Sequence, residues 1–166
     1  MIRPRRLPSV LLGIAVFFLI CSPQGAAMAF FSKKEVVVGS PMEGVLSYKG
    51  KPASGAQLRR HLRWKDETGV TDTVVADQNG HFSLPAVTDS WRPLLPAEFV
   101  AHQKVYVEYQ GEEYLIWTMG KMDESLYGEL GGKPNDLICE ITGELARVEV
   151  DHGMLGTVCR WSSIDR

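Results

Sequence analysis

Residues 43–84 read EGVLSYKGKPASGAQLRRHLRWKDETGVTDTVVADQNGHFSL, and this stretch decides the fold. Short runs of β-branched and apolar residues alternate in it with glycine, proline and Asn-Gly turn signals, as in strands joined by tight turns. The clearest strand covers residues 57–64, in which Leu58 and Leu62 lie on one face and polar side chains lie on the other. Arg60 is the charged residue on the apolar face, and we expect it to lie near an edge of the sheet.

Two turn signals predict β-hairpins. Residues 71–76 and 81–84 flank the tetrapeptide DQNG, whose Asn-Gly step supplies the positive φ angles that a tight turn needs. Residues 105–109 and 114–119 flank Gln110-Gly111 in the same way. Other predicted strands cover residues 35–38, 44–48, 137–142, 145–150 and 157–161. Strands at this spacing predict an all-β sandwich of about seven to nine strands.

A set of glycine, proline and apolar positions runs through the same stretch: Gly44-Val45, Gly50-Lys51-Pro52, Gly55-Ala56, Thr73, Asp77, Asn79-Gly80, Phe82 and Leu84. This set resembles the carboxypeptidase regulatory-like domains, which are small, prealbumin-like β-sandwiches. The resemblance implies an antiparallel Greek-key sandwich, of which residues 43–90 form the carboxypeptidase regulatory-like part. We expect Ala56, Leu58, Phe82 and Leu84 to point into one core. A proline-rich segment after residue 84 departs from the family pattern.

The same resemblance implies a binding or scaffolding role, because domains of this type have no active site to transfer. The part of the chain that contains Cys139 and Cys159 is similar to uncharacterised bacterial exported proteins built around such a domain.

The N-terminus has the pattern of a secretory signal peptide. Three arginines precede an apolar run of eleven residues, 10–20, which is too short to span a bilayer but is typical of a signal-peptide core. Ala27 and Ala29 then place small side chains at positions −3 and −1, which predicts cleavage before Phe30. We therefore expect a signal helix in residues 1–29, a single sandwich domain in residues 30–166, and a periplasmic or secreted protein. An uncleaved membrane anchor is the alternative.

Cleavage changes both the cysteine count and the charge. Cys21 leaves with the signal, and lipid attachment there is disfavoured by Ile20, so Cys139 and Cys159 remain as an even pair for a disulfide. The whole chain has 18 basic and 20 acidic residues. Removal of three arginines leaves 15 against 20, a net charge of −5, which disfavours a general nucleic-acid or anionic-membrane binder.

No motif of a known enzyme stands out. The chain has no GxSxG, SxxK, HExxH or Walker-type pattern, and residues 128–133 (GELGGK) read as a solvated loop. The four histidines lie 20 or more residues apart, which does not indicate a metal site. Residues 120–136 read as a loop with a possible helical turn over 124–130. We therefore expect a non-catalytic protein without a cofactor or metal.

Three surface features remain as candidate partner-binding residues. The first is a basic stripe on one strand face, and the second is an acidic hairpin tip. The third is an apolar loop between prolines, which either caps the core or contacts a partner. In this order, their residues are Arg59, His61, Arg63 and Lys65; Glu108, Glu112 and Glu113; and Trp91, Leu94 and Leu95.

These features predict an exported β-sandwich that binds a partner protein in the cell envelope, for example as an immunity-type protein against an envelope-active toxin. The alternative is an envelope structural or carbohydrate-binding module. Carbohydrate binding would require exposed aromatic side chains, for which Trp91 and Trp117 are the candidates.

Overall fold

The computed structural model describes residues 33–92, 97–151 and 153–166, and this part of the chain contains strands and turns but no helix. The predicted signal peptide, with its cleavage site at Ala27, Ala29 and Phe30, lies outside the described residues. The same holds for Leu94 and Leu95 of the apolar loop.

The described part forms fifteen strands, several of only two or three residues. They are β1 (Lys34–Gly39), β2 (Met42–Tyr48), β3 (Lys51–Pro52), β4 (Gln57–Arg63), β5 (Val70–Val75), β6 (His81–Leu84), β7 (Val87–Trp91), β8 (Ala101–Tyr109), β9 (Glu112–Lys121), β10 (Lys133–Asn135), β11 (Ile138–Glu140), β12 (Ala146–Val150), β13 (Gly153–Thr157), β14 (Cys159–Arg160) and β15 (Ser163–Asp165).

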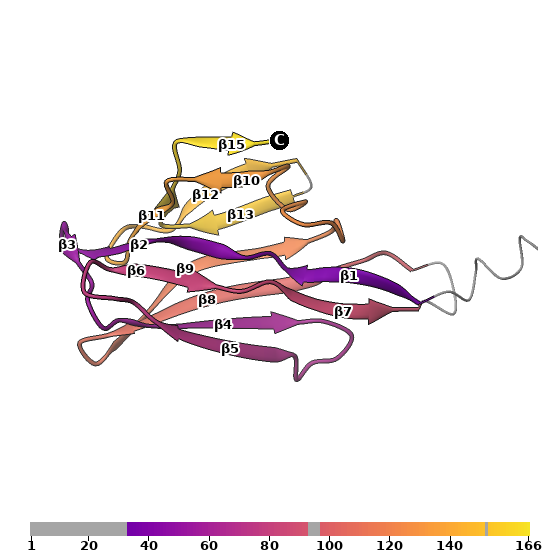
Figure 1. Ribbon diagram of the computed structural model, residues 1–166, viewed down its shortest axis with the longest axis horizontal. Coiled ribbons are helices and arrows are strands. Elements are labelled where there is room, and N and C mark those ends of the chain that lie inside the picture. The colour runs from indigo at the N-terminus through magenta and orange to yellow at the C-terminus, as the bar shows by residue number, and fades with distance from the viewer. Residues whose placement is uncertain (1–32, 93–96, 152) are drawn as a thin grey trace, which may run out of the picture. The chain divides into compact units, whose positions relative to one another are not determined.

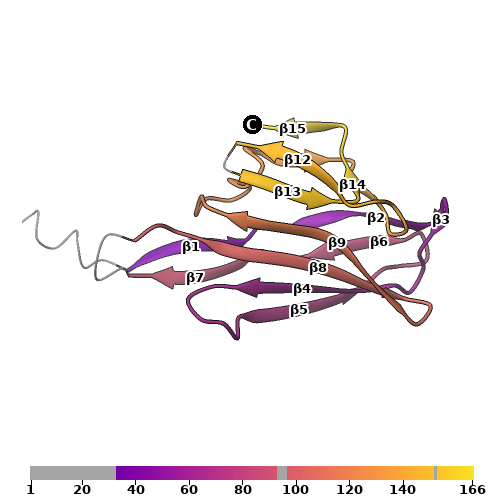
Figure 2. The ribbon, with the colours of Figure 1, turned by 180° about the vertical axis from the view of Figure 1, so that it is seen from behind.

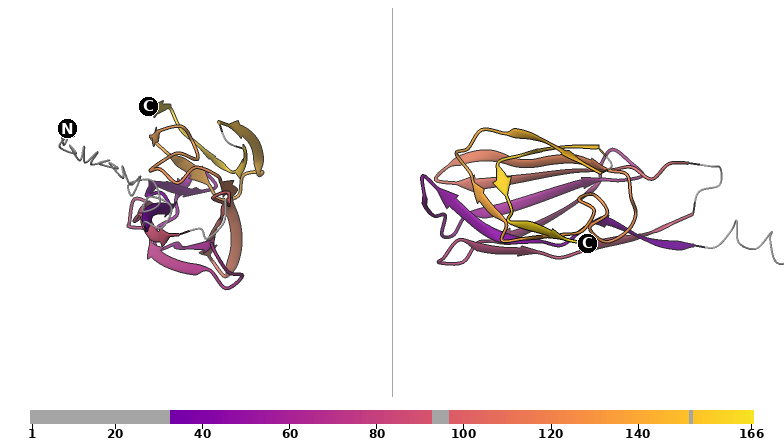
Figure 3. Two further views of the ribbon diagram at one scale, coloured as in Figure 1. Left: turned by 90° about the vertical axis from the view of Figure 1, so that its right-hand side faces the viewer. Right: turned by 90° about the horizontal axis from the view of Figure 1, so that it is seen from above.

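Two main sheets contain most of these strands (Figure 1). One has six strands in the order β12-β13-β9-β8-β4-β5, all antiparallel, and Figure 2 shows them following one another in this order. The other has the order β14-β11-β2-β3, with β6 also paired to β2, and its β2–β11 pair is parallel. In the end-on view of Figure 3 the two sheets lie on opposite sides of the interior. The prediction of an all-β sandwich is confirmed.

One of the two predicted hairpins forms. Strands β8 and β9 pair across Gln110 and Gly111, whose φ angles of 55° and 83° are those of a two-residue hairpin turn. The prediction of a hairpin at DQNG is wrong, because β5 pairs with β4 in one main sheet and β6 pairs with β2 in the other. The turn still forms, and it carries the chain between the sheets.

The DQNG turn is built from its own hydrogen bonds and a close approach to β2. The Asp77 carboxylate accepts hydrogen bonds from the backbone N–H groups of Asn79 (2.8 Å) and His81 (2.9 Å). A Cβ on Gly80 would lie 2.3 Å from the carbonyl oxygen of Leu46, so only glycine fits there. Because these contacts satisfy the turn without strand pairing, the turn residues do not decide which sheet each flanking strand joins.

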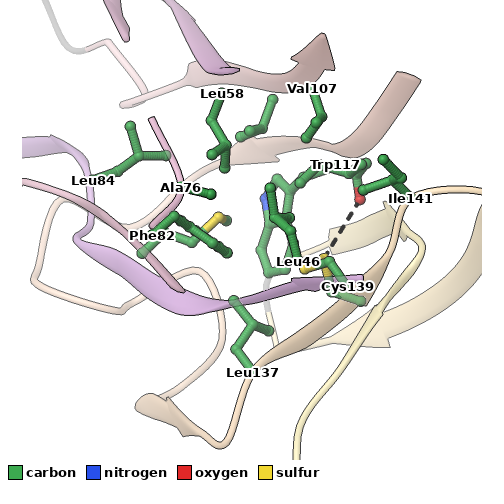
Figure 4. Close-up of a cluster of buried hydrophobic side chains, with 14 of the residues drawn as sticks. Leu46, Leu58, Ala76, Phe82, Leu84, Val107, Trp117, Leu137, Cys139 and Ile141 are labelled. Carbon is green, nitrogen blue, oxygen red and sulfur yellow. Dashed lines mark hydrogen bonds between the residues drawn. A yellow bond between two sulfur atoms is a disulfide. The ribbon is translucent and has the colours of Figure 1, made fainter. Parts of the chain in front are cut away.

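The main core lies between the two sheets (Figure 4). Ala56, Leu58, Phe82 and Leu84 are all buried in this one cluster, which confirms the expectation for these four residues. A second buried cluster lies next to the β1–β7 pair. It consists of Val36, Val38, Leu62, Phe99 and Ala101, with Trp64, Val87 and Trp91 packed against it.

The predicted disulfide is present. Cys139 on β11 and Cys159 on β14 lie directly opposite each other in an antiparallel pair, with their Cα atoms 4.0 Å apart. Both side chains belong to the main core, and the Cys139–Cys159 bond therefore joins two sequence-distant strands inside the sandwich.

Arg60 does not lie on an edge strand, because β4 pairs with β8 on one side and β5 on the other. Its side chain is fully buried, and its guanidinium donates two hydrogen bonds to the Asp72 carboxylate of the edge strand β5, at 3.0 and 2.6 Å. It also donates to the carbonyl oxygens of Ser40 (2.7 Å) and Pro85 (2.6 Å). The residue that breaks the alternation of β4 is thus a buried charge whose hydrogen-bonding groups are satisfied.

A second buried ion pair lies at the end of β9. The Lys121 ammonium contacts the Glu129 carboxylate at 2.5 Å, and the two side chains are 0% and 5% exposed. Glu129 also accepts a hydrogen bond from the Ser40 hydroxyl at 2.8 Å, which links this pair to the residue whose carbonyl binds Arg60. Residues 126–131 form successive turns without a helix, so the prediction of a helical turn over 124–130 is wrong.

Glu140 on β11 holds the turn between β2 and β3. Its carboxylate accepts hydrogen bonds from the Ser47 and Thr142 hydroxyls and from the backbone N–H groups of Lys49 and Gly50, at 2.6–3.0 Å. Burial raises the pKa of this carboxyl, but the hydrogen bonds from Thr142, Gly50, Lys49 and Ser47 together outweigh that effect and lower the pKa to about 2.

We expect Glu140→Gln to lower the free energy of unfolding by about 1–2 kcal/mol at pH 7, a modest amount because the carboxylate is only partly buried. The folded-state pKa lies below the unfolded value, so this stabilisation is fully present above about pH 4.5 and is lost as the pH falls toward 2. Urea unfolding at several pH values measures it. The difference from wild type should shrink between these two pH values. A difference that is independent of pH, or equal to that of Glu144→Gln at an exposed position, would contradict this role.

Candidate functional site

A groove with a volume of about 760 Å³ lies on the outer face of the six-stranded sheet. We call it the outer groove. Its lining comes from five strands, β4, β8, β9, β12 and β13, together with Glu67 of the β4–β5 turn. The alternation of each strand explains which residues reach it: on β4, the side chains of Leu58, Arg60 and Leu62 are buried, while Arg59 and Arg63 point outward.

One row of residues crosses the outer groove from strand to strand. His61 on β4 is opposite Lys104 on β8, which is opposite Thr118 on β9. Thr118 is opposite Gly156 on β13, which is opposite Arg147 on β12. The order of these strands can be followed in Figure 2. Register therefore places two cations, Lys104 and Arg147, on one line across the sheet, although they are far apart in the sequence.

The cations of the outer groove differ in their partners. Arg59 pairs with Glu113 at 2.6 Å and lies 4.8 Å from the centre of the Tyr106 ring, and Arg63 pairs with Glu67 at 2.8 Å. Within the described ranges, neither Lys104 nor Arg147 forms an ion pair with a carboxylate; the Arg147 guanidinium contacts the sulfur of Met154. Both unpaired cations are exposed, so they are available to an anionic group in the groove.

Two glycines, Gly120 and Gly156, are among the residues that line the outer groove. Gly120 on β9 is next to His102, and a Cβ there would lie 3.8 Å from the His102 imidazole, which is ordinary contact. Its backbone has no positive φ that would require glycine. Glycine inside a strand weakens it and often marks a place where a ligand or another chain approaches closely. Gly156 on β13 has less room for a side chain than Gly120, because a Cβ there would crowd the Thr118 methyl at 2.9 Å.

The structure brings the predicted basic stripe into this groove. Arg59, His61 and Arg63 all line it, whereas Lys65 lies elsewhere and binds Asp89 at 2.6 Å. The hydrogen bond from Lys65 lowers the pKa of the Asp89 carboxyl; burial opposes this, and bonds from Ser90 and Trp64 support it.

The acidic hairpin tip contributes one residue to the groove. Glu113 lines it and pairs with Arg59, while Glu108 and Glu112 are exposed beside the turn.

The aromatic candidates lie away from the outer groove. Trp91 packs against Trp64 and Phe99, with ring centres 6.0 and 5.8 Å apart, and so belongs to the second buried cluster. Trp117 is only 2% exposed and belongs to the main core. Of the predicted apolar loop, the described residue Trp91 therefore caps a buried cluster and does not present an exposed ring.

The other candidate sites of the described residues are smaller or have no matching group of side chains. A second hollow of about 350 Å³ lies along β2 and β10 and includes Glu43, His81 and Lys133. In the described part of the chain, no group of three or more His, Cys, Asp or Glu side chains is placed to hold a metal ion. A helix long and apolar enough to cross a membrane is likewise not found among the described residues.

The sequence interpretation missed His102, Lys104 and Arg147. The signal for the first two was available, since His102, Lys104 and Tyr106 alternate with buried residues on β8 just as the stripe does on β4. Arg147 gave no such signal, because its neighbours across the sheet are set by the pairing of β12, β13 and β9.

A family model described as Domain of unknown function (DUF6795) matches residues 42–144, which is more than half of the chain. The match includes β4, β8 and β9 of the outer groove, while β12 and β13 follow it. No curated protein and no solved structure matches the chain.

Proposed function

Because the chain belongs to the DUF6795 family, whose description assigns no function, we propose a function from the outer groove. The protein is an exported, non-catalytic β-sandwich that binds a partner protein on the outer face of its six-stranded sheet. The observation that carries this proposal is the open hollow of about 760 Å³ on this face, which is lined by side chains of five strands.

The groove suits protein binding because its floor is a hydrogen-bonded sheet. Its lining residues lie mostly on strands that pair on both sides, so the side chains are held in place before a partner arrives. Its surface is mixed in charge, with Arg59 and Arg63 bound to glutamates beside two free cations. Mixed, complementary charge provides specificity and register in protein–protein contacts.

One concrete version is an immunity-type protein that neutralises an envelope-active toxin by covering part of its surface. The alternative is an envelope structural or carbohydrate-binding module. Carbohydrate binding would use exposed aromatic rings, and both candidates for that role, Trp91 and Trp117, are packed in hydrophobic clusters. Tyr106 does line the outer groove, but the Arg59 guanidinium lies over its ring. These contacts favour the protein partner.

The sandwich itself is proposed to be a divergent carboxypeptidase regulatory-like domain. Support comes from the turns at Gly50, Gly55 and Gly80, which have φ angles of 73–81°, and from the shared burial of Phe82 and Leu84 in the main core. Export is proposed from the N-terminal charge, apolar run and small residues of the sequence. A chain recovered from the envelope that begins at Phe30 by mass spectrometry would support it.

The proposal is tested by filling the outer groove without changing its charge. Gly120→Phe adds a ring at a position that lines the hollow and where a Cβ would make only ordinary contact, so we expect the fold to be retained. The full chain is produced with a C-terminal tag in the organism that encodes it, and proteins that co-purify from envelope extracts are quantified. A specific partner should be captured by wild type and reduced at least about tenfold by Gly120→Phe, because the ring occupies the site.

The matched control is Lys51→Phe, which adds the same ring at an exposed position on the other main sheet. It should capture the partner as wild type does. Equal capture by wild type and Gly120→Phe would contradict binding in the outer groove.

A further inference from the structure

We infer that the partner presents an acidic segment to the outer groove, with one carboxylate against Lys104 and another against Arg147. This inference rests on the proposed function and adds the chemistry of the contact. It starts from the row His61–Lys104–Thr118–Gly156–Arg147, in which no residue carries a carboxylate.

The free groups in this row are donors. Lys104 offers three N–H donors, Arg147 offers the guanidinium N–H groups other than the Nε that contacts the Met154 sulfur, and Thr118 adds a hydroxyl, which can also donate, between them. The His61 imidazole is already hydrogen-bonded to the Thr71 hydroxyl at 3.0 Å. A carboxylate is the protein side-chain group that only accepts hydrogen bonds and carries the opposite charge, so it matches both cations.

The distance between the two cations fits an extended peptide. Strands β8 and β12 are separated by three strand spacings, about 14 Å between Cα atoms at about 4.8 Å per spacing. An extended chain covers this distance in about four residues, at about 3.3 Å each, and residues four apart point to the same side. Two acidic residues separated by three others would therefore reach Lys104 and Arg147 together.

Carboxylates beside the row favour a short acidic segment over a uniformly charged polymer. Glu113 on β9 and Glu67 in the β4–β5 turn both line the outer groove, and each is bound to an arginine of β4. Glu149 shares the outer face of β12 with Arg147, two residues along the strand. A long polyanion that extends beyond the row would meet these glutamates, whereas a segment with two carboxylates in the middle would not.

The experiment uses the purified full chain and labelled peptides of roughly eight residues, long enough to cross the groove when extended. One peptide has two glutamates separated by three neutral residues, and the second has glutamines at the same positions. Fluorescence anisotropy should show binding of the glutamate peptide and at least about tenfold weaker binding of the glutamine peptide. Added salt should weaken the binding, because the contacts are exposed ion pairs.

Two variants locate the contact. Lys104→Glu with Arg147→Glu should lower the affinity for the glutamate peptide at least about tenfold, because attraction becomes repulsion. Lys51→Glu with Arg160→Glu makes the same charge change at exposed residues outside the groove and should leave the affinity unchanged. Equal binding of both peptides, binding of neither, or the same loss in both double variants would overturn the inference. Preferential binding of heparin, a polyanionic sugar, at Lys104 and Arg147 would also overturn it.

The partner capture separates this inference from the function on which it rests. If Gly120→Phe abolishes capture but the Lys104→Glu, Arg147→Glu variant still captures the partner, the outer groove binds a partner by other chemistry and only the inference fails. If Gly120→Phe captures the partner normally, the proposed function itself fails.

Discussion

Replacing Lys121 by methionine is expected to lower the free energy of unfolding by about 3–5 kcal/mol, the cost of removing one partner from a buried ion pair. Methionine matches the length and apolar stem of lysine but leaves the Glu129 carboxylate, 5% exposed, without its cation. The substitution also removes the hydrogen bond from the Lys121 ammonium to the Ser125 carbonyl at 2.7 Å, which fixes the residue just before the turns of residues 126–131. Equilibrium unfolding in urea measures the change.

The double variant Lys121→Met, Glu129→Leu should recover much of this loss, because it removes both charges and leaves no unpaired buried ion. Lys51→Met is the control for the loss of an exposed lysine, and it should change the free energy of unfolding by less than about 0.5 kcal/mol. A Lys121→Met variant as stable as this control would show that the ammonium does not compensate Glu129 in the folded protein.

Replacing both Cys139 and Cys159 by alanine is expected to cost about 3 kcal/mol, within a range of about 2–5 kcal/mol for native disulfides. The bond closes a loop with a sequence separation of 20 and lies in the main core. Its loss releases that loop in the unfolded chain and leaves β11 and β14 joined only by strand pairing and packing. The measurement is the urea midpoint and the free energy of unfolding of the double variant.

Wild type under reducing conditions provides the matched comparison, since it breaks the same bond without changing the side-chain volume. Both should unfold at a lower urea concentration than oxidised wild type. Coincident unfolding curves for oxidised and reduced wild type would contradict a stabilising disulfide.

Local pattern predicted much of the sandwich. The alternation in residues 57–64 correctly assigned the two faces of β4, and Gln110-Gly111 correctly marked the β8–β9 hairpin. The hairpin prediction at DQNG failed because the Asp77 carboxylate accepts the hydrogen bonds of the turn's own backbone N–H groups, so the turn needs no strand pairing. A turn of this kind fits a hairpin and a crossover between sheets equally well, and long-range pairing with β2 and β4 decides between them.

The sequence indicated only one residue of the two buried ion pairs. Arg60 stood out as a cation on an apolar face, but its partner Asp72 is recognisable only once β5 is placed beside β4. Lys121 and Glu129 occur in a polar, glycine-rich segment that is typical of a solvated loop. Glu129 also accepts a hydrogen bond from Ser40, which precedes both residues by more than eighty positions, so no local pattern indicates this buried pair.

The candidate site was also predicted only in part, because the local pattern does not show which strands lie side by side. Arg59, His61 and Arg63 form a stripe on one strand, so the period of two was enough to find them. Lys104 and Arg147 come from two other strands, and only the register across β8, β9, β13 and β12 brings them into one row with His61.

The most direct test of binding in the outer groove is site-specific photo-crosslinking from Thr118, which lies in the row between Lys104 and Gly156. A photoreactive phenylalanine analogue is placed at Thr118, or at Lys51 as the control, and cells are irradiated before the protein is isolated. The expected result is a covalent adduct with one partner protein from Thr118 that is absent from Lys51 and is lost when Gly120→Phe is added. An adduct formed equally from both positions, or from Lys51 alone, would contradict a partner-binding site on the outer face of the six-stranded sheet.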